Sequence, residues 1–215
     1  MMGLADRDRR RAGTIWARNL DGDAPVVLPA CPAAFDRVGP EAANLLAAAM
    51  GPGSLAEIRK RFAAGRLCYA AWVGRELASY GWVSYEEEMV GELNLRLSLV
   101  PGEAYVWDCA TLPAFRGRHL YSALLSHILR DLYVQPVCRV WIGADLDNLA
   151  SQRGIARAGF HRVADLLVER VLAMRLVWAR GHPDVPESWV AEARRVYLGN
   201  RDRVWLDSLA SSRRS

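Results

Sequence analysis

The sequence predicts an α/β protein in which a mixed β-sheet is covered by helices on both faces, as a three-layer α/β/α sandwich. Three observations support this fold class. Strand and helix patterns follow one another in the order β, α, α, β, β, β, α, β, α, β, β, an order that places helices against a sheet. The 215 residues, 52% of them apolar, are enough to bury a sizeable core. A strand, a tight loop and a helix also follow one another without interruption in residues 105–132.

Residues 105–132 carry the clearest pattern in the chain. The run YVWDCAT predicts a strand over residues 105–111, and Pro113 ends it because proline has no N–H to donate. Leucine and isoleucine then recur at helical spacing from Leu120 to Leu132, which predicts a helix with one buried stripe. The loop between strand and helix reads Arg116-Gly117-Arg118-His119. The free N–H groups and partial positive charge of a helix N-terminus, together with two arginines, indicate an anion site suited to phosphate.

The residues before this unit are expected to contain an arm, one short strand and two helices. Residues 1–13 are polar and basic without an apolar period, so we predict a disordered basic arm. A short strand is expected at residues 26–28. One helix is expected over residues 32–50, with Pro40 interrupting it, and a second over residues 54–65.

The middle of the chain is predicted to be rich in strands. Two strand-like runs, residues 67–73 and 77–85, are joined by a Gly-Arg-Glu turn and predict a hairpin. The glutamates at residues 86–88 are interpreted as a solvated turn. Residues 92–100 alternate leucine with polar residues, which indicates a half-buried antiparallel strand.

The last third of the chain is predicted to complete the sheet and add a helix. A buried strand is expected over residues 137–144, a short helix over 148–158, and a second hairpin over 160–178. A further helix is expected at about residues 187–198. The predicted organisation is a disordered arm at 1–13, a domain at 14–181, and a C-terminal helical extension and tail at 182–215.

Charge and composition restrict the classes of partner. The net charge is +4, the isoelectric point is about 9.1, and Lys60 is the only lysine, so the cations are almost all arginine, which suits bidentate binding of phosphate or carboxylate. The basic run at residues 7–11 has no aromatic or helical reader beside it, so nucleic-acid binding is not expected. No apolar run reaches the length of a membrane span, so no membrane partner is expected, and no secretory signal is recognised.

The four cysteines favour a reducing compartment. Cys31, Cys68, Cys109 and Cys138 are scattered and show no metal-ligand spacing, so no metal site is predicted. Three of them lie in apolar runs, as buried free thiols do. A cytoplasmic location is therefore expected. The oligomeric state stays open, with a homodimer as one alternative.

Two motifs at a fixed separation resemble those of the GNAT superfamily of acyltransferases. The run TLPAFRGRHLYSALL resembles the family's strand, pyrophosphate loop (R/Q-x-x-G-x-G/A) and helix, with Arg116 at the first loop position. The run DNLASQRGIARAGF resembles the family's second motif, through Asn148, Ser151, Gly159 and Phe160. The resemblance covers about residues 26–175 by element order and 111–160 by motif. It implies a mixed, mostly antiparallel sheet with helices on both faces.

The resemblance also implies acetyl-CoA, or a related acyl-CoA, as co-substrate. In the family the pantetheine arm lies like an extra strand between two splayed strands, here residues 105–111 and 138–144. Backbone groups near Ala110 and Thr111 would pair with the arm and polarise the thioester carbonyl. The implied cofactor-binding residues are Ala110, Thr111, Arg116, Gly117, Arg118, His119, Leu120, Tyr121, Ser122, Asn148 and Ser151. The alternative for Asn148 and Ser151 is an ordinary helix N-cap and first-turn residue.

Three positions depart from the family pattern. His119 and Tyr121 stand where glycine or alanine is usual, and a positive φ at either would cost roughly 1–2 kcal/mol. The His119 ring either lies beside the phosphates or faces solvent, and Tyr121 either joins the core or donates a proton. Ile155 stands where many members have a tyrosine that protonates the leaving thiolate. Gly154, inside a predicted helix, indicates a close approach by another group.

The acid and the base are less defined by the sequence. Asp108 on the central strand is the first candidate base, with Glu103 and the glutamates at 86–88 as alternatives. Tyr121, Tyr105 or water would replace the missing acid, or the thiolate would leave unaided, since its pKa is only about 8.5. A base matters most for a lysine-like amine, because at pH 7 fewer than about 0.1% of such groups are neutral. Cys109 is interpreted as a buried core thiol rather than a nucleophile.

The expected function is acyl-CoA-dependent N-acyl transfer, most simply of acetyl, to a primary amine by direct attack through a tetrahedral intermediate. The acceptor would be a small-molecule or peptide amine. One alternative is an inactive protein of this fold that binds CoA or a partner. Another is an acyltransferase for longer chains, with a tunnel lined by Trp72, Trp82, Trp107 and Trp141.

Overall fold

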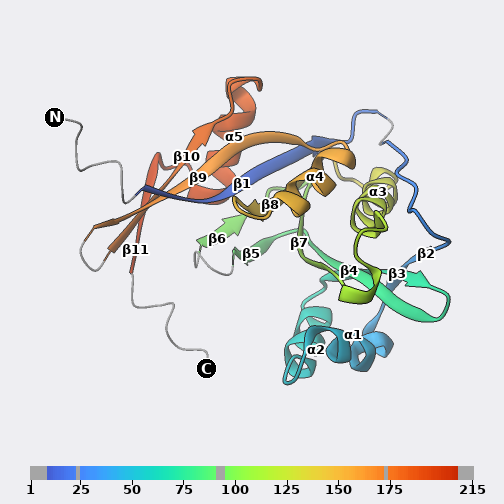
Figure 1. Ribbon diagram of the computed structural model, residues 1–215. Coiled ribbons are helices and arrows are strands. Elements are labelled where there is room, and N and C mark those ends of the chain that lie inside the picture. The colour runs from blue at the N-terminus through green and yellow to red at the C-terminus, as the bar shows by residue number, and fades with distance from the viewer. Residues whose placement is uncertain (1–8, 23–24, 91–94, 172–173, 208–215) are drawn as a thin grey trace.

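The structure is a computed structural model that describes residues 9–22, 25–90, 95–171 and 174–207 (Figure 1). Its centre is a nine-stranded sheet. The strands are β1 (Arg9–Asn19), β2 (Ala34–Val38), β3 (Leu67–Val73), β4 (Glu76–Ser84), β7 (Glu103–Thr111), β8 (Arg139–Asp145), β9 (His161–Val171), β10 (Met174–Gly181) and β11 (Arg203–Asp207). Their order across the sheet is β11-β10-β9-β1-β8-β7-β4-β3-β2, and β5 (Glu87–Val90) and β6 (Leu95–Ser98) form a separate pair.

Helices cover both faces of this sheet. They are α1 (Ala43–Met50), α2 (Leu55–Ala63), α3 (Leu120–Tyr133), α4 (Leu149–Arg157) and α5 (Glu187–Leu198), with short 3-10 turns at Pro40–Ala42 and Pro113–Phe115. One face carries α3 and α4, and the other carries α1 and α2 at one end and α5 at the other (Figure 1). Strands β7 and β8 pair in parallel, whereas the other pairings of the sheet are antiparallel. The predicted fold class, a mixed and mostly antiparallel sheet between helical layers, is confirmed.

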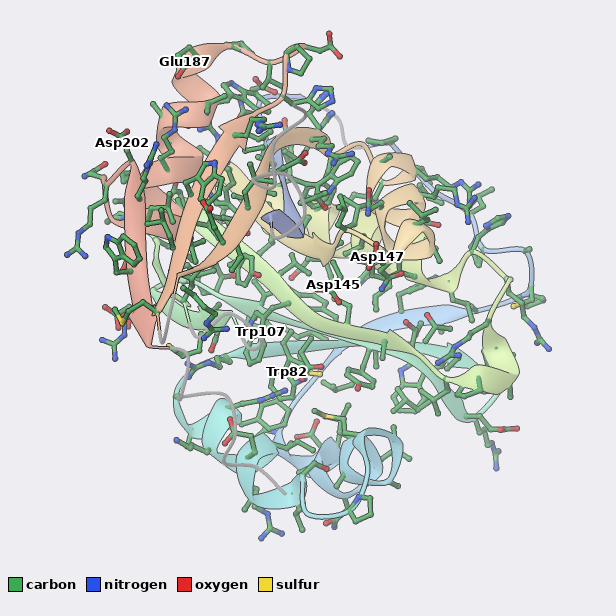
Figure 2. The ribbon with its side chains drawn as sticks, turned by 60° about the vertical axis from the view of Figure 1, so that its left-hand side comes forward. Trp82, Trp107, Asp145, Asp147, Glu187 and Asp202 are labelled. Atoms are coloured by element: carbon green, nitrogen blue, oxygen red, sulfur yellow. The ribbon has the colours of Figure 1, made fainter. Side chains whose placement is uncertain are left out.

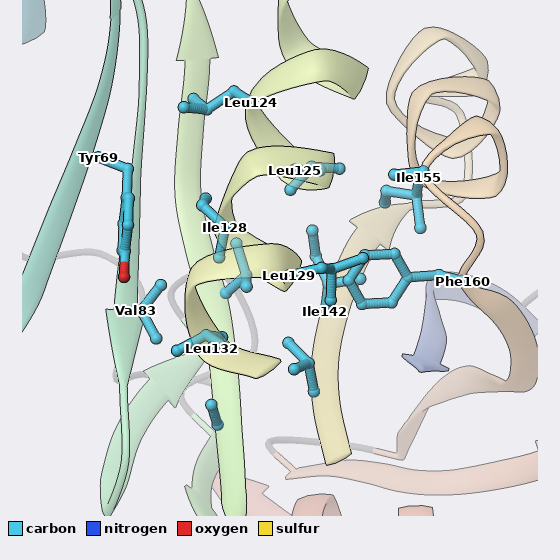
Figure 3. Packing of buried hydrophobic residues seen from close by; sticks show 14 of the residues in the cluster. Tyr69, Val83, Leu124, Leu125, Ile128, Leu129, Leu132, Ile142, Ile155 and Phe160 are labelled. Atoms are coloured by element: carbon cyan, nitrogen blue, oxygen red, sulfur yellow. The ribbon is translucent and has the colours of Figure 1, made fainter. Parts of the chain in front are cut away.

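The buried stripe of α3 anchors the largest core cluster (Figure 3). Each of its six predicted apolar residues is at most 1% exposed; they are Leu120, Leu124, Leu125, Ile128, Leu129 and Leu132. Full burial of one such side chain stabilises a fold by roughly 1.5–3 kcal/mol. Ile155 and Phe160 pack against the same cluster from α4 and the segment after it. The helix that carries the predicted anion loop is therefore held rigidly against the sheet.

The N-terminal predictions need correction. Residues 9–13, expected to lie in a disordered arm, begin β1, and residues 1–8 of that arm lie outside the described residues. The strand expected at 26–28 is absent, and the first part of the helix expected over 32–50 is β2. Both β1 and β2 are stabilised by pairing with strands that are distant in sequence, a contribution that local composition does not contain.

Two further segments differ from expectation. The glutamates expected in a solvated turn partly belong to β5, and Glu88 is buried. The C-terminal segment is not only helical, because β11 pairs with β10 and so extends the main sheet. The strand expected over 92–100 is β6 in its described part, while residues 92–94 and the tail at 208–215 lie outside the described residues. The hairpin of β3 and β4, the unit of β7 and α3, and helix α5 are present as predicted. Within the described part of the chain, no helix combines the length and apolarity needed to cross a membrane.

Candidate active site

Strands β7 and β8 diverge in the middle of the sheet. They pair from Glu103↔Arg139 to Val106↔Ile142, and the pairing ends there. Beyond that point β7 continues against β4 and β8 continues against β1, so no described strand lies between residues 107–111 and 143–145. Burial falls at the same place, since side chains of β7 are buried through Val106 and partly exposed or exposed after it. The facing edges therefore offer backbone N–H and C=O groups to an extended ligand, and the family resemblance implies that this ligand is a pantetheine arm.

A β-bulge marks this opening. Trp82 pairs with Trp107 and Tyr80 pairs with Ala110, so two residues of β7 oppose one residue of β4. Asp108, in the bulge, has a φ of +42°. A non-glycine residue in this region is strained by the order of 1–3 kcal/mol, and such strain concentrates at functional sites.

The side chain of Asp108 is bound by Arg61 of helix α2. Arg61 Nη1 donates a 2.5 Å hydrogen bond to Asp108 Oδ2, and its guanidinium lies 4.4 Å from the ring centroid of Trp107 and 5.2 Å from that of Trp82. The two tryptophans lie on the side of the sheet toward α1 and α2 (Figure 2). The Asp108 side chain is one-third exposed. The predicted base is thus an oriented carboxylate beside the opening; Arg61, which fixes it, was not predicted because the contact spans 47 residues.

The N-terminus of α3 lies at the end of the short turn that follows β7. The N-cap residue of this helix is His119, whose side chain makes no capping hydrogen bond, and Ser122 Oγ in the first turn donates to His119 O. Gly117 has a φ of +79°, and Arg116, Gly117 and Arg118 are all exposed. Arg116 Nε donates to Thr111 O at 3.1 Å, which places this arginine beside the open edge of β7. An uncapped helix start with two accessible arginines fits a pyrophosphate.

His119 adopts the left-handed conformation, with a φ of +58°. This is the strained geometry that the sequence analysis raised for a histidine at a position where the family usually has glycine or alanine. Its Nδ1 lies 2.5 Å from Arg157 Nη1, so Nδ1 is the acceptor and Nε2 carries the proton. Arg157 is thereby a third arginine at the loop. The sequence analysis missed it because it belongs to the last turn of α4.

Tyr121 points from α3 toward α4. Its hydroxyl lies 3.2 Å from Ser151 Oγ, and a Cβ at Gly154 would lie 2.5 Å from the edge of its ring. The close approach predicted at Gly154 is therefore present, and its partner is Tyr121. Burial raises the pKa of Tyr121 above the ordinary value of 10.0, so the phenol stays protonated at neutral pH and keeps a proton to donate.

Asn148 and Ser151 begin helix α4. Asn148 Oδ1 accepts a 3.0 Å hydrogen bond from the Ser151 backbone N–H, which is the N-cap alternative raised by the sequence. Ile155, in the position where many relatives place an acidic tyrosine, is fully buried in the core. It leaves no titratable group at that place.

The alternative bases lie in other networks. Glu103 is buried where β7 begins and accepts hydrogen bonds from Trp141 and Arg195. Glu88 is also buried and bonds Arg66 and Ser84. Both carboxylates are buried, whereas the Asp108 side chain, although it also binds an arginine, is one-third exposed beside the opening.

Cys109 follows Asp108 in the bulge. Its Sγ lies 2.7 Å from the place of a Cβ at Gly81, so the thiol fills the room that this glycine leaves. Burial raises the pKa of Cys109, which opposes formation of a nucleophilic thiolate. The described residues contain no group of three or more metal-ligating side chains.

Comparison with known proteins agrees with this geometry. A family model described as acetyltransferase (GNAT) family matches residues 52–160. Among solved structures, a tandem GNAT protein from the clavulanic acid biosynthesis pathway is 21% identical, with 82% of this chain and 56% of that chain covered and a TM-score of 0.50. AAC(6')-Iy in complex with the bisubstrate analogue CoA-S-monomethyl-acetylneamine is 14% identical, with 60% and 91% covered and a TM-score of 0.50.

A GNAT-family acetyltransferase from Colwellia psychrerythraea is 15% identical, with a TM-score of 0.49. The match covers 72% of this chain and 53% of that one, so the chain spans about half the length of that relative. No curated protein matches the chain. The likenesses to the tandem GNAT protein and to AAC(6')-Iy support the fold, and the family model covers about half of the chain, including β7, the loop, α3 and α4. The chain therefore belongs to the GNAT family of acetyltransferases, enzymes that use acetyl-CoA.

Proposed function

We propose that this chain transfers an acetyl group from acetyl-CoA to a primary amine, by direct attack of the amine on the thioester through a tetrahedral intermediate. The observation that carries the proposal is the opening between β7 and β8, with the Asp108 bulge at its side. The proposed acceptor is a small-molecule or peptide amine, which in protonated form is attracted by the Asp108 carboxylate.

Different residues around the opening would bind different parts of the co-substrate. The N–H groups of residues 117–122 would bind the pyrophosphate, with Arg116 and Arg118 as charge partners and the His119 ring beside them. The edge of β7 at Ala110 and Thr111, which does not pair with β8, would pair with the pantetheine arm and polarise the thioester carbonyl. The start of α4 at Asn148 and Ser151 would flank the arm, with Leu120, Tyr121 and Ser122 forming the first turn beneath it.

Asp108 is proposed as the base. It would hold the incoming ammonium group and accept the proton that the nitrogen must lose before or during attack. The carbon–sulfur bond then breaks, and the thiolate takes up one proton, so the net reaction neither consumes nor releases protons for a neutral amine. A lysine-like amine gains most from this base, because its neutral form costs roughly 4–5 kcal/mol at pH 7.

Acetyl is favoured over a longer acyl chain by the placement of the tryptophans. Trp82 and Trp141 are fully buried and belong to two separate core clusters, one with α1 and α2 and the other with α5. They fill the core in different places instead of lining one tunnel. A cytoplasmic location is supported by four free cysteines, since disulfides are the rule in oxidising compartments.

Calorimetric titration with acetyl-CoA and CoA tests the cofactor site. Wild-type protein should bind in the micromolar range, and Arg116→Ala, Arg118→Ala together should weaken binding at least about 10- to 100-fold. Arg130→Ala is the matched control, because Arg130 is an exposed arginine in the last turn of the same helix. No binding by the wild type contradicts the cofactor site. Equal losses in both variants would indicate a non-specific charge effect.

A panel of primary amines, followed by thiol release from acetyl-CoA, tests the activity. The assay should be run in a Cys138→Ser background, because Cys138 is exposed and would react with the thiol reagent. Tight acetyl-CoA binding without turnover on any amine class would favour the alternative of an inactive binding protein.

A further inference from the structure

Two tyrosines meet on the face of the sheet that α5 covers. Tyr105 comes from β7 and Tyr197 from the last turn of α5, and they are 5% and 2% exposed. Their rings are in edge contact, with centroids 6.2 Å apart and an interplanar angle of 87°. The contact joins the C-terminal helix to the strand that forms one wall of the opening.

Both hydroxyls reach the point where β7 and β8 separate. A Cβ at Gly143 would lie 3.4 Å from the Tyr105 hydroxyl oxygen and 3.6 Å from that of Tyr197. Gly143 is the first residue of β8 after the last pair with β7, Val106↔Ile142. The two hydroxyls therefore lie at the closed end of the opening, separated from it by a residue without a side chain.

The Tyr197 hydroxyl is buried and interacts with the hydroxyl of Tyr105, and it has no further hydrogen-bond partner within the described part of the chain. A buried hydroxyl with one polar partner leaves part of its hydrogen-bonding capacity unused, which costs stability, so it usually persists for a reason other than stability. Here it is placed beside the one stretch of β8 where the sheet is open.

Protonation makes these hydroxyls donors. Burial raises the pKa of both Tyr105 and Tyr197 above the ordinary value of 10.0, so both remain neutral at physiological pH. An alkyl thiol titrates near 8.5, so complete proton transfer from either phenol to a leaving thiolate would be uphill. The favourable role is a hydrogen bond to negative charge, without transfer of the proton.

We propose that Tyr197, together with Tyr105, donates a hydrogen bond past Gly143 to the negative charge that develops on the thioester sulfur as the thiolate leaves. Helix α5, which lies outside the family-matched residues 52–160, would then complete the active site. This inference rests on the proposed acetyl transfer. It adds a donor on the face opposite α3 and α4, where Tyr121 lies.

Steady-state kinetics of four variants test the proposal. Tyr197→Phe and Tyr105→Phe should each lower kcat, up to roughly 10²-fold, which is the loss typical of one donor to a developing charge. KM for acetyl-CoA should stay within about twofold, because the donor acts on the transition state. Gly143→Ala should lower kcat as well, because the new methyl group would stand between the two hydroxyls and the opening. The substitution should not strain the fold, since the φ of Gly143 lies outside the left-handed region and the methyl would make only ordinary van der Waals contacts.

Tyr69→Phe is the matched control. The Tyr69 hydroxyl is likewise in the core, but it donates to Asp131 at 2.5 Å, far from the opening. Its loss should lower the melting temperature and leave kcat unchanged. Tyr197→Phe should show the opposite pattern, a lower kcat with an unchanged or higher melting temperature, which a purely structural tyrosine would not give.

A titration of bound CoA separates this inference from the proposed function. If wild-type protein binds CoA but turns over no amine, the pKa of the bound thiol still reports a nearby donor: it should be lower in the wild type than in Tyr197→Phe. An active wild type with undiminished kcat in Tyr197→Phe overturns the inference and leaves the proposed function standing. Equal thiol pKa values in an inactive protein also overturn it, and absence of CoA binding overturns both.

Discussion

The guanidinium of Arg61 and the carboxylate of Asp108 meet at 2.5 Å, which ties helix α2 to the bulge of β7. One carboxylate oxygen is engaged by this contact, and the side chain is still one-third exposed. A negative charge is therefore fixed in direction at the edge of the opening, and it remains accessible to an incoming ammonium group.

Asp108→Asn is expected to lower kcat/KM for the amine roughly 10²-fold, because the amide keeps the shape of the side chain but neither attracts nor deprotonates an ammonium group. Affinity for CoA, measured by calorimetry, should not change. Glu57→Gln is the control, since Glu57 is the exposed partner of the same arginine, at 3.6 Å. An undiminished kcat/KM in Asp108→Asn would remove Asp108 from the mechanism.

Gly154→Ala is expected to destabilise the protein by about 1–3 kcal/mol, because the new methyl overlaps the Tyr121 ring. This loss exceeds the gain of about 1 kcal/mol that alanine brings to a helix interior. Urea unfolding measures the difference. In a Tyr121→Leu background the same substitution should become neutral or stabilising, and additivity of the two changes would show that they do not contact.

His119→Gly is expected to be more stable than His119→Ala by about 1 kcal/mol, because only glycine adopts a φ of +58° without strain. Both variants lose the contact with Arg157, so the difference between their free energies of unfolding reports the backbone strain alone. Thermal unfolding gives the stabilities. If both variants bind CoA as the wild type does, the imidazole is not a phosphate ligand.

The cysteines should differ strongly in reactivity. Cys138 is exposed and should react with a thiol reagent at pH 8. Burial raises the pKa of Cys68 to about 12, so only about 10⁻⁴ of this group is thiolate at pH 8 and it should stay unmodified until the protein unfolds. The burial of Cys68 stabilises the fold fully below pH 9.0, and this contribution is lost as the pH rises toward 12. Rapid labelling of Cys68 in folded protein, detected by peptide mapping, would contradict this burial.

The local sequence pattern was sufficient to predict a helix or strand where the segment has its own hydrophobic periodicity. Helix α3 was predicted because six apolar residues recur on one face, and the hairpin of β3 and β4 because two apolar runs flank a glycine turn. The loop at residues 116–119 and the helix start after it were also located from the sequence, and phosphate binding at this loop stays a prediction. Strands β1 and β2 were missed because their stability comes from partners far away in sequence.

The residues of the candidate site also fall into those that a local sequence pattern identifies and those that only the fold brings together. Arg116, Gly117 and Arg118 are neighbours in sequence and were found as a motif. Arg61 and Tyr197 approach the opening from α2 and α5, so no local pattern connects them with Asp108 or Tyr105. Identifying such residues requires the packing of helices on the sheet, which the sequence specifies only through the complete fold.

The position of β1 has a consequence for how the protein folds. This strand lies between β8 and β9, and Thr14 bonds to Ala144 across 130 residues of sequence. During synthesis residues 9–19 remain unpaired until β8 and β9 have both left the ribosome. Closing so long a loop is slow, and an unpaired strand is exposed to aggregation meanwhile. We therefore expect the segments at 67–90 and 95–133, whose contacts are more local, to become ordered first and β1 to be inserted last.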